Sequence, residues 1–137
     1  MIIVDASVAF KWFNPDNEKF RHESLLLLKN HKDNKEVIVI PSLLLMEVVN
    51  ALVTKTNIDT KTIKEDLDLL HDANLQIYSF KKNDLEEAAL QANQYKTTFY
   101  DMLYAVVAKR NKTILVTADE NFIKKTKFKF VKHIKEI

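Results

Sequence analysis

Short, continuously apolar runs alternate with longer segments in which apolar residues recur at helical spacing. The runs at 1–4, 37–40 and 113–117 are typical of strands buried on both faces. Mixed runs at 75–80 and 128–133 predict two further strands. The spacing of apolar residues between the runs predicts helices over residues 18–30, 42–54, 60–73, 83–94, 98–110 and 120–125.

Strands that alternate with helices predict βαβ units, and therefore a parallel sheet covered by helices on both faces. The 137 residues have the length of one ordinary domain and contain no internal repeat, low-complexity segment or linker. We therefore expect one three-layer α/β/α domain over residues 1–137.

Two residue types are absent, and each absence excludes a class of site. Without cysteine the chain has no disulfide, thiolate zinc site or thiol nucleophile. Without glycine it has neither GxGxxG nor GxxxxGK[ST], the loops that usually bind nucleotide phosphates. Helix ends then need another residue for a left-handed cap, and we expect Asn30, Asn57 and Asn111 to supply it.

The net charge of +2 is unevenly distributed along the chain. Residues 1–108 carry 12 basic and 16 acidic side chains (−4), whereas residues 109–137 carry 9 basic and 3 acidic ones (+6). A basic end can follow a polyanion, but a solvated, lysine-rich strand and helix give the same balance, and we favour the latter. The chain starts like a strand and has no apolar run as long as a membrane span, so we expect a cytoplasmic protein.

Acidic residues stand where two predicted strands end. Asp5 follows the first strand, Asp119 follows the run at 113–117, and a helix follows each. In open α/β sheets ligands bind beyond the carboxyl ends of strands, near a topological switch point. Either acid alone is as well explained as a helix N-cap. The two together are better explained by a shared cation.

Two further acids lie on predicted helices. Glu47 is the only ionisable residue between Glu36 and Lys55, and a charge buried there costs several kcal/mol unless it is paired or metal-bound. A polar stripe with Asn50 and Thr54 that faces water is an equally good explanation. For Asp101 the structural alternative is stronger, because Thr98-x-x-Asp101 resembles a capping box. Ala105 and Ala108 on its face predict close packing.

Four carboxylates with no competing cluster of histidine or cysteine predict an all-oxygen site for Mg²⁺ or Mn²⁺. The four histidines lack the spacing of metal ligands. Adjacent carboxylates repel one another unless a cation or bound protons neutralise them. Metal sites of this kind typically activate water and neutralise charge on a phosphate.

The acids lie in stretches that occur in order along the whole chain. These stretches are Val4-Asp5-Ala6-Ser7-Val8, Lys11-Trp12-Phe13, Pro41-Ser42-Leu43, Glu47-Val48-x-Asn50-Ala51-Leu52, Tyr100-Asp101-x-x-Tyr104-x-x-x-Ala108 and Leu115-Val116-Thr117-Ala118-Asp119-x-x-Phe122. With them the chain resembles the PIN-domain ribonucleases, and specifically the VapC-type toxins of toxin–antitoxin pairs. It departs from the pattern at Met102, where alanine is frequent, and at Asn111-Lys112, where glycine is usual.

The resemblance implies a parallel five-stranded sheet of order 3-2-1-4-5 and a ribonuclease that cleaves single-stranded or loop RNA, leaving a 5′-phosphate and a 3′-hydroxyl. One or two Mg²⁺ or Mn²⁺ ions would be held by Asp5, Asp101 and Asp119. Glu47 would orient the attacking water or complete a second metal site. The hydroxyls of Ser7 and Thr117 would support the site.

The resemblance also implies partners. A small VapB-like antitoxin would block the acidic cleft, and two copies of the chain would form a homodimer through helices, to which the apolar residues of 25–28 and 43–45 would contribute. Lys11 is a candidate contact for an RNA phosphate and Trp12 for a base, although an exposed loop lysine and a core or interface tryptophan are the simpler explanations.

Rival functions stay open. A housekeeping PIN ribonuclease without an antitoxin has the same residues. A non-catalytic α/β binding module would use all four acids as helix caps. A phosphoacceptor signalling domain needs paired acids at the first strand end, where Val4 precedes Asp5, and a haloacid-dehalogenase phosphatase needs a second aspartate where Ser7 stands. Loss of Mn²⁺-dependent stabilisation in Asp5→Asn or Asp101→Asn would distinguish ligands from caps.

Overall fold

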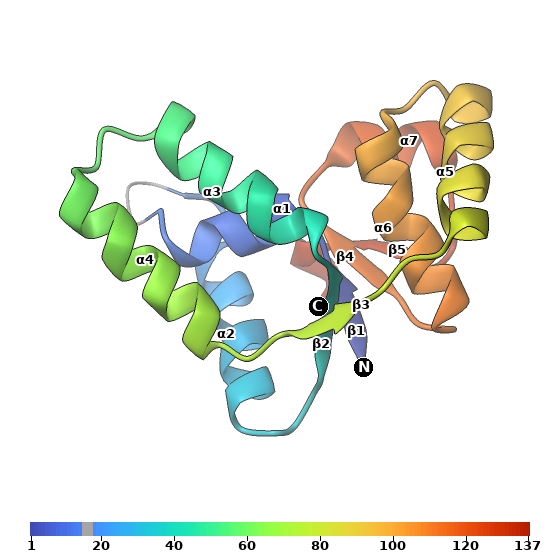
Figure 1. Ribbon diagram of the computed structural model, residues 1–137. Coiled ribbons are helices and arrows are strands. Elements are labelled where there is room, and N and C mark those ends of the chain that lie inside the picture. Colours follow the sequence, from blue (N-terminus) through green and yellow to red (C-terminus); the bar gives the residue numbers. More distant parts are fainter. Residues whose placement is uncertain (15–17) are drawn as a thin grey trace.

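The computed structural model describes residues 1–14 and 18–137, and Figure 1 shows helices on both sides of a central parallel sheet. Five strands are hydrogen-bonded in the order β3-β2-β1-β4-β5. Their bounds are β1 Ile2–Val4, β2 Ile38–Pro41, β3 Gln76–Tyr78, β4 Leu115–Thr117 and β5 Val131–His133. The expected α/β class and strand order are therefore confirmed.

The central strand determines where a site can form. In β1, Ile3 pairs with Val39 of β2 on one side and with Leu115 of β4 on the other. Every residue of β1, β2 and β4 is buried, as their unbroken apolar sequences predict. The chain leaves β1 for β2 and returns later to β4, so the strand order reverses around β1 and opens a crevice at its carboxyl end.

Two groups of helices cover the sheet. In Figure 1, α2, α3 and α4 lie on one side and α5, α6 and α7 on the other. The helices are α1 Ala6–Ala9, α2 Arg21–Lys32, α3 Leu43–Lys55, α4 Thr60–Asp72, α5 Lys82–Tyr95, α6 Phe99–Arg110 and α7 Glu120–Thr126, with short 3₁₀ turns at Phe10–Trp12 and Ile134–Glu136. No helix in the described part of the chain is long and apolar enough to cross a membrane.

Helix α6 is the most deeply buried of these elements. Its residues 102–108 are buried without interruption, and it packs against β1, β2 and β4. The small side chains of Ala105 and Ala108 let the helix approach the sheet closely, as their spacing predicts. The close approach brings the first turn of α6, which carries Asp101, to the carboxyl end of the sheet.

Asparagine supplies left-handed caps after α2 and α4, as expected of its residue type, but at Asn34 and Asn74 rather than at the three positions named. Asn30 lies inside α2, and Asn111 caps α6 with φ −89°, donating its side-chain N–H to the carbonyl of Val107. Asn57 is likewise absent from the residues with positive φ, which are Phe20, Asn34, Asn74, Lys96, Lys112 and Lys127. Without glycine, each such turn costs roughly 1 kcal/mol of backbone strain.

The strands predicted at 75–80, 113–117 and 128–133 are each shorter than their apolar runs.

A buried acid ties three elements together away from the crevice. Asp84, in the first turn of α5, is 2 % exposed. Its carboxylate accepts hydrogen bonds from the hydroxyl of Tyr78 in β3 and from the N–H of Lys81, both at 2.9 Å. It also pairs with Nε of Arg110, at the end of α6, at 3.0 Å. The edge strand β3 is thereby fixed to α5 and α6.

Replacing Asp84 with alanine should lower the free energy of unfolding by about 2 kcal/mol, because the hydroxyl of Tyr78, the N–H of Lys81 and the guanidinium of Arg110 all lose their shared acceptor. Glu87→Ala is the matched control. Glu87 also pairs with Arg110, but at the surface, so its loss should cost less than about 1 kcal/mol. Urea denaturation followed by circular dichroism measures both variants. Equal effects would contradict this account of Asp84.

Candidate active site

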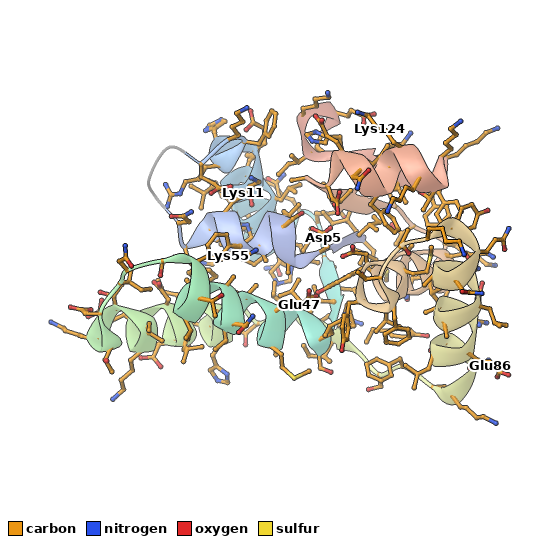
Figure 2. The ribbon with its side chains drawn as sticks, turned by 90° about the horizontal axis from the view of Figure 1, so that it is seen from above. Asp5, Lys11, Glu47, Lys55, Glu86 and Lys124 are labelled. Atoms are coloured by element: carbon orange, nitrogen blue, oxygen red, sulfur yellow. The ribbon has the colours of Figure 1, made fainter. Side chains whose placement is uncertain are left out.

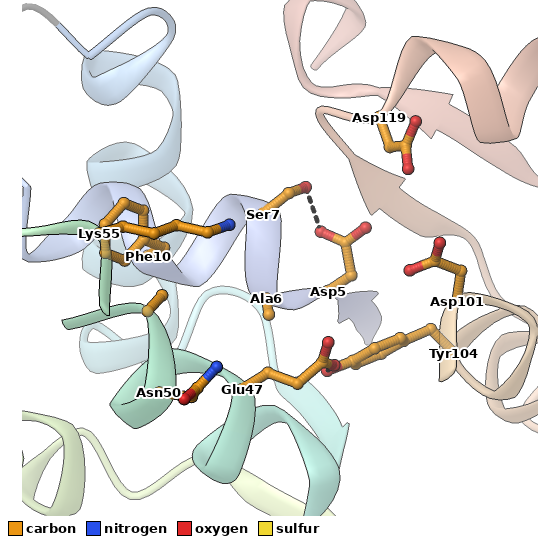
Figure 3. A pocket seen from close by; sticks show the side chains of 11 residues that line it. Asp5, Ala6, Ser7, Phe10, Glu47, Asn50, Lys55, Asp101, Tyr104 and Asp119 are labelled. Carbon is orange, nitrogen blue, oxygen red and sulfur yellow. Dashed lines mark hydrogen bonds between the residues drawn. The ribbon is translucent and has the colours of Figure 1, made fainter. Parts of the chain in front are cut away.

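The four acids singled out from the sequence line one pocket of about 270 Å³ beyond the carboxyl ends of the strands (Figure 3). They come from four separate elements. Asp5 follows β1, Glu47 lies on α3, Asp101 lies in the first turn of α6 and Asp119 follows β4. The remaining lining residues are Ala6, Ser7, Phe10, Asn50, Ala51, Lys55 and Tyr104.

Asp5 is the most heavily hydrogen-bonded of the four. It caps α1 by accepting the N–H of Val8 at 3.2 Å. The hydroxyl of Ser7 donates to its Oδ1 at 2.5 Å, and the hydroxyl of Thr117 donates to its Oδ2. The same two hydroxyl oxygens accept the N–H groups of Ala118, at 3.0 Å, and Asp119, at 3.0 Å. The ends of β1 and β4 are therefore held together through this carboxylate.

The surroundings of Asp5 favour its protonated form. Burial raises its pKa from 3.8 to about 6, and repulsion from Asp101 adds to the increase. The hydrogen bonds from Ser7, Thr117 and Val8 act in the opposite direction and only partly offset the burial. A nearby cation would reverse this balance and favour the charged carboxylate.

Glu47 points into the pocket and is held there by a partner from another helix. The hydroxyl of Tyr104 on α6 donates to its Oε1 at 2.6 Å (Figure 3 shows the two side chains meeting). Burial raises the pKa of Glu47, and repulsion from Asp101 contributes, while the bond from Tyr104 lowers it. Of the two explanations that the sequence left equal, the structure therefore favours a carboxylate that faces a cleft.

Asp101 and Asp119 combine structural bonds with a place on the pocket wall. Thr98 caps α6 by accepting the N–H of Asp101 at 3.1 Å, and Asp119 caps α7 by accepting the N–H of Phe122 at 3.0 Å. Burial raises the pKa of Asp101, repulsion from Asp119 adds to this, and attraction to Lys125 opposes it. Capping and lining the pocket are thus not exclusive roles, since Asp5 and Asp119 have both.

The side chains of the pocket fit a hard divalent cation. Apart from Lys55 and Tyr104, every ionisable side chain on the pocket wall is a carboxylate, the oxygen ligand that such cations prefer. Throughout residues 1–14 and 18–137, no three Asp, Glu, His or Cys side chains are grouped closely enough to enclose a metal ion. The acids instead stand apart on the pocket walls, the arrangement that mutual repulsion favours.

Lys11 and Trp12 do not present the surfaces that contact with RNA requires. Lys11 is 6 % exposed and pairs with Glu18 at 2.7 Å, so the expectation of an exposed loop lysine was wrong. Trp12 is 5 % exposed, and its indole N–H donates to the carbonyl of Ser24 at 2.9 Å. Trp12 is therefore a core residue, in agreement with the simpler of its two explanations.

Sequence reasoning gave no role to three residues of the pocket, Tyr104, Asn50 and Lys55. Helical spacing held a signal for two of them. Tyr104 follows Asp101 by three positions and Asn50 follows Glu47 by three positions, so each shares a helix face with an acid. Nothing in the sequence indicated that these faces of α3 and α6 meet each other.

Comparison with known proteins agrees with this arrangement. The family model described as PIN domain matches residues 2–128. The chain belongs to the PIN domain family. PIN domains are typically nucleases, and membership implies a nucleic-acid substrate.

A solved structure supports the fold of this PIN domain. The crystal structure of PAE2754 from Pyrobaculum aerophilum superimposes with a TM-score of 0.69 at 23 % sequence identity, covering 98 % of this chain and 91 % of that one. At this identity the likeness concerns the fold alone. Among curated proteins, none matches the sequence.

Replacing Asp5 with asparagine should remove a pH-dependent contribution to stability in metal-free protein. Because the folded state raises the pKa of Asp5 from 3.8 to about 6, this contribution is fully present below the lower value. It is lost as pH rises through the upper value. The unfolding free energy of the wild type, minus that of Asp5→Asn, should fall by up to ~3 kcal/mol between about pH 4 and about pH 7.

Urea denaturation in EDTA at several pH values measures this difference. Asp33→Asn is the control with the opposite sign, because a hydrogen bond from Lys29 lowers the pKa of exposed Asp33 and its contribution is lost on acidification. If the difference in unfolding free energy between wild type and Asp5→Asn does not change with pH, burial does not raise the pKa of Asp5.

Proposed function

We propose that this PIN domain is a metal-dependent endoribonuclease that hydrolyses phosphodiester bonds of single-stranded or loop RNA. The observation that carries the proposal is the meeting of Asp5, Glu47, Asp101 and Asp119, from four elements, on the wall of one pocket. Glu47 argues against a module in which acids are only caps, because it lies in the middle of α3 and its described partner is Tyr104 rather than a backbone N–H.

Asp5, Asp101 and Asp119 would hold Mg²⁺ or Mn²⁺, with Glu47 beside them. A bound divalent ion supplies a lowered pKa for a coordinated water and neutralises negative charge on the phosphate. Ser7 and Thr117 hold both oxygens of Asp5 in position, so the carboxylate does not turn away when the pocket fills.

Glu47 has the environment of a group that orients and deprotonates water. Burial keeps its pKa above the usual range, which brings it closer to neutrality, where a base is most effective. Burial also raises the pKa of Tyr104, so its hydroxyl keeps its proton and continues to donate to Glu47. Tyr104 is thus a positioning residue that fixes the direction of the carboxylate.

We further propose that the chain is the toxin of a VapBC-type pair, blocked by a VapB-like antitoxin, and acts as a homodimer. Support for a partner comes from an apolar groove on α3, lined by Leu45, Met46, Val49, Asn50 and Val53. Met46 is 63 % exposed and Val53 is 59 % exposed, an unusual surface for a helix that faces only water. Asn50 lines both this groove and the acid pocket, so a partner here lies beside the site.

Purified protein should degrade total cellular RNA in the presence of Mn²⁺. Asp5→Asn, Asp101→Asn and Asp119→Asn should each lower the rate by on the order of 100-fold or more, because each removes a charged group that holds the ion or faces the phosphate. Electrophoresis of the RNA over time measures the rates, and end-labelling checks for a 5′-phosphate.

Asp68→Asn, an exposed acid of α4 away from the pocket, is the matched control and should cut like the wild type. Mn²⁺ at a hundred times its dissociation constant should also stabilise the wild type by about 2.7 kcal/mol, which a higher melting temperature would report, but should not stabilise Asp119→Asn. Equal degradation by wild type and pocket variants would indicate a contaminant. Equal Mn²⁺ stabilisation of all variants would favour the binding module.

Replacing Tyr104 with phenylalanine should keep the buried ring and remove the donor to Glu47. We expect kcat to fall about tenfold, equivalent to about 1.4 kcal/mol. The acidic limb of the pH–rate profile should move to higher pH, because Glu47 loses the bond that lowers its pKa. Tyr100→Phe, on the same helix but 55 % exposed, should change neither. An unshifted profile with lowered kcat would assign Tyr104 a purely structural role.

A further inference from the structure

A second cleft opens against the far side of Asp101 and Asp119. It has a volume of about 350 Å³, and both acids belong to its wall as well as to the wall of the acid pocket. The rest of this lysine cleft is formed by Lys96, Thr97, Thr98, Asn121, Phe122 and Lys125. It therefore lies between the loop that joins α5 to α6 and the helix α7.

We infer that the lysine cleft binds the backbone phosphate of a nucleotide next to the cleaved bond. The inference rests on the proposed ribonuclease function and specifies how the RNA strand leaves the acid pocket. A strand whose scissile phosphate lies at Asp101 and Asp119 meets the lysine cleft directly, because these two residues form the boundary between the cavities.

The ammonium group of Lys125, one of the two lysines of the cleft, is held in place by a hydrogen bond. Nζ of Lys125 donates to the carbonyl oxygen of Lys96 at 2.8 Å, which fixes the ammonium group across the cleft and leaves two N–H donors for a ligand. Its charge reaches the acids, since attraction to Lys125 lowers the pKa of Asp101. A positioned ammonium beside hydroxyl and amide side chains is the chemistry that binds phosphate oxygens.

The balance of acidic and basic side chains favours the lysine cleft, rather than the other cavity that borders Asp119, as the path of the RNA strand. That cavity, of about 590 Å³, is lined by Lys11, Glu18, Lys19, Phe20, Ala118, Asp119, Glu120 and His133. Its buried lysine is already paired with Glu18, and its carboxylates outnumber its lysines. In the lysine cleft the acids are the two shared with the active site, and a divalent ion would neutralise them.

The opposite end of the acid pocket carries a lysine too. Lys55, the last residue of α3, lines the pocket and extends toward Ser7, on the side away from Asp101 and Asp119 (Figure 3). Its charge lowers the pKa of Glu47. The carboxylates are thus bracketed by Lys55 and Lys125, which gives the RNA backbone a path across the pocket from α3 to α7.

The test measures binding separately from cutting. In a background of Asp5→Asn, which we expect to slow cleavage by on the order of 100-fold or more, a fluorescein-labelled single-stranded RNA of random sequence is titrated with protein in Mn²⁺ at several KCl concentrations. Adding Lys125→Gln should weaken binding about fivefold and reduce the slope of log K against log salt by about 0.7, the value of one lost phosphate contact. Lys125→Arg, which keeps the charge, should restore most of both.

The neighbouring Lys124→Gln is the matched control, because it removes the same charge from the same helix. Lys124 is not part of the lysine cleft and lies on the side of α7 away from Asp5 (Figure 2). It should weaken binding less than twofold. Equal losses for Lys124→Gln and Lys125→Gln would overturn the inference in favour of diffuse attraction, and no loss for Lys125→Gln would overturn it directly.

Failure of the inference is distinguishable from failure of the proposed function. If the wild type cuts RNA and the acid variants do not, but Lys125→Gln binds normally, the nuclease stands and the lysine cleft does not hold the strand. If no protein cuts RNA, yet Lys125→Gln alone weakens binding, the cleft binds RNA in a protein that is not a nuclease.

Discussion

The bond between the Thr117 hydroxyl and Asp5 is the constraint on which the rest of the site depends. β1 and β4 are neighbours in the sheet, and the last backbone bond between them is the one that the N–H of Asp5 donates to the carbonyl of Val116 at 3.4 Å. Beyond that point Ser7 and Thr117 continue the connection through side chains and through the N–H groups of Ala118 and Asp119. The two chain reversals that carry Asp5 and Asp119 are therefore one unit, and their carboxylates cannot drift apart independently.

Asp5 and Asp119 each have two structural roles. Asp5 and Asp119 cap helices, which by itself would explain their presence at strand ends. Each of them also lines the acid pocket, so the backbone bonds that end a strand and begin a helix also fix the position of a carboxylate of the site.

The α/β class and most of the helices follow from local periodicity, and the positions of Asp5 and Asp119 at strand ends follow from topology. The strand order 3-2-1-4-5 and the shared site with Glu47 and Asp101 came from the resemblance to PIN-domain ribonucleases. The chemical roles of these acids stay predictions. What the sequence did not show depends on contacts between elements. The partner of Glu47 lies 57 positions away, and no local pattern indicates which faces of two helices will meet. The burial of Lys11 likewise goes with its ion pair to Glu18, seven positions away, which no local pattern indicated.

The left-handed turns were predicted only in part. Asparagine, the expected substitute for glycine, takes the left-handed position after α2 and after α4, whereas lysine takes it after α5, α6 and α7. Residue type alone therefore did not predict which residue after each helix adopts the left-handed conformation, because the position at which each helix ends was not predicted to the residue.

The shortness of α7 has a consequence for how this protein can vary. The helix starts after Asp119 of the acid pocket and carries Lys125 near its other end. At about 1.5 Å per residue, it separates the two by about 9 Å along its axis. One inserted or deleted residue would turn that lysine by about 100° and point it elsewhere, while leaving the acid untouched. Changes to the exposed residues of α7 would leave this spacing intact, whereas a change in its length would separate the lysine cleft from the acid pocket.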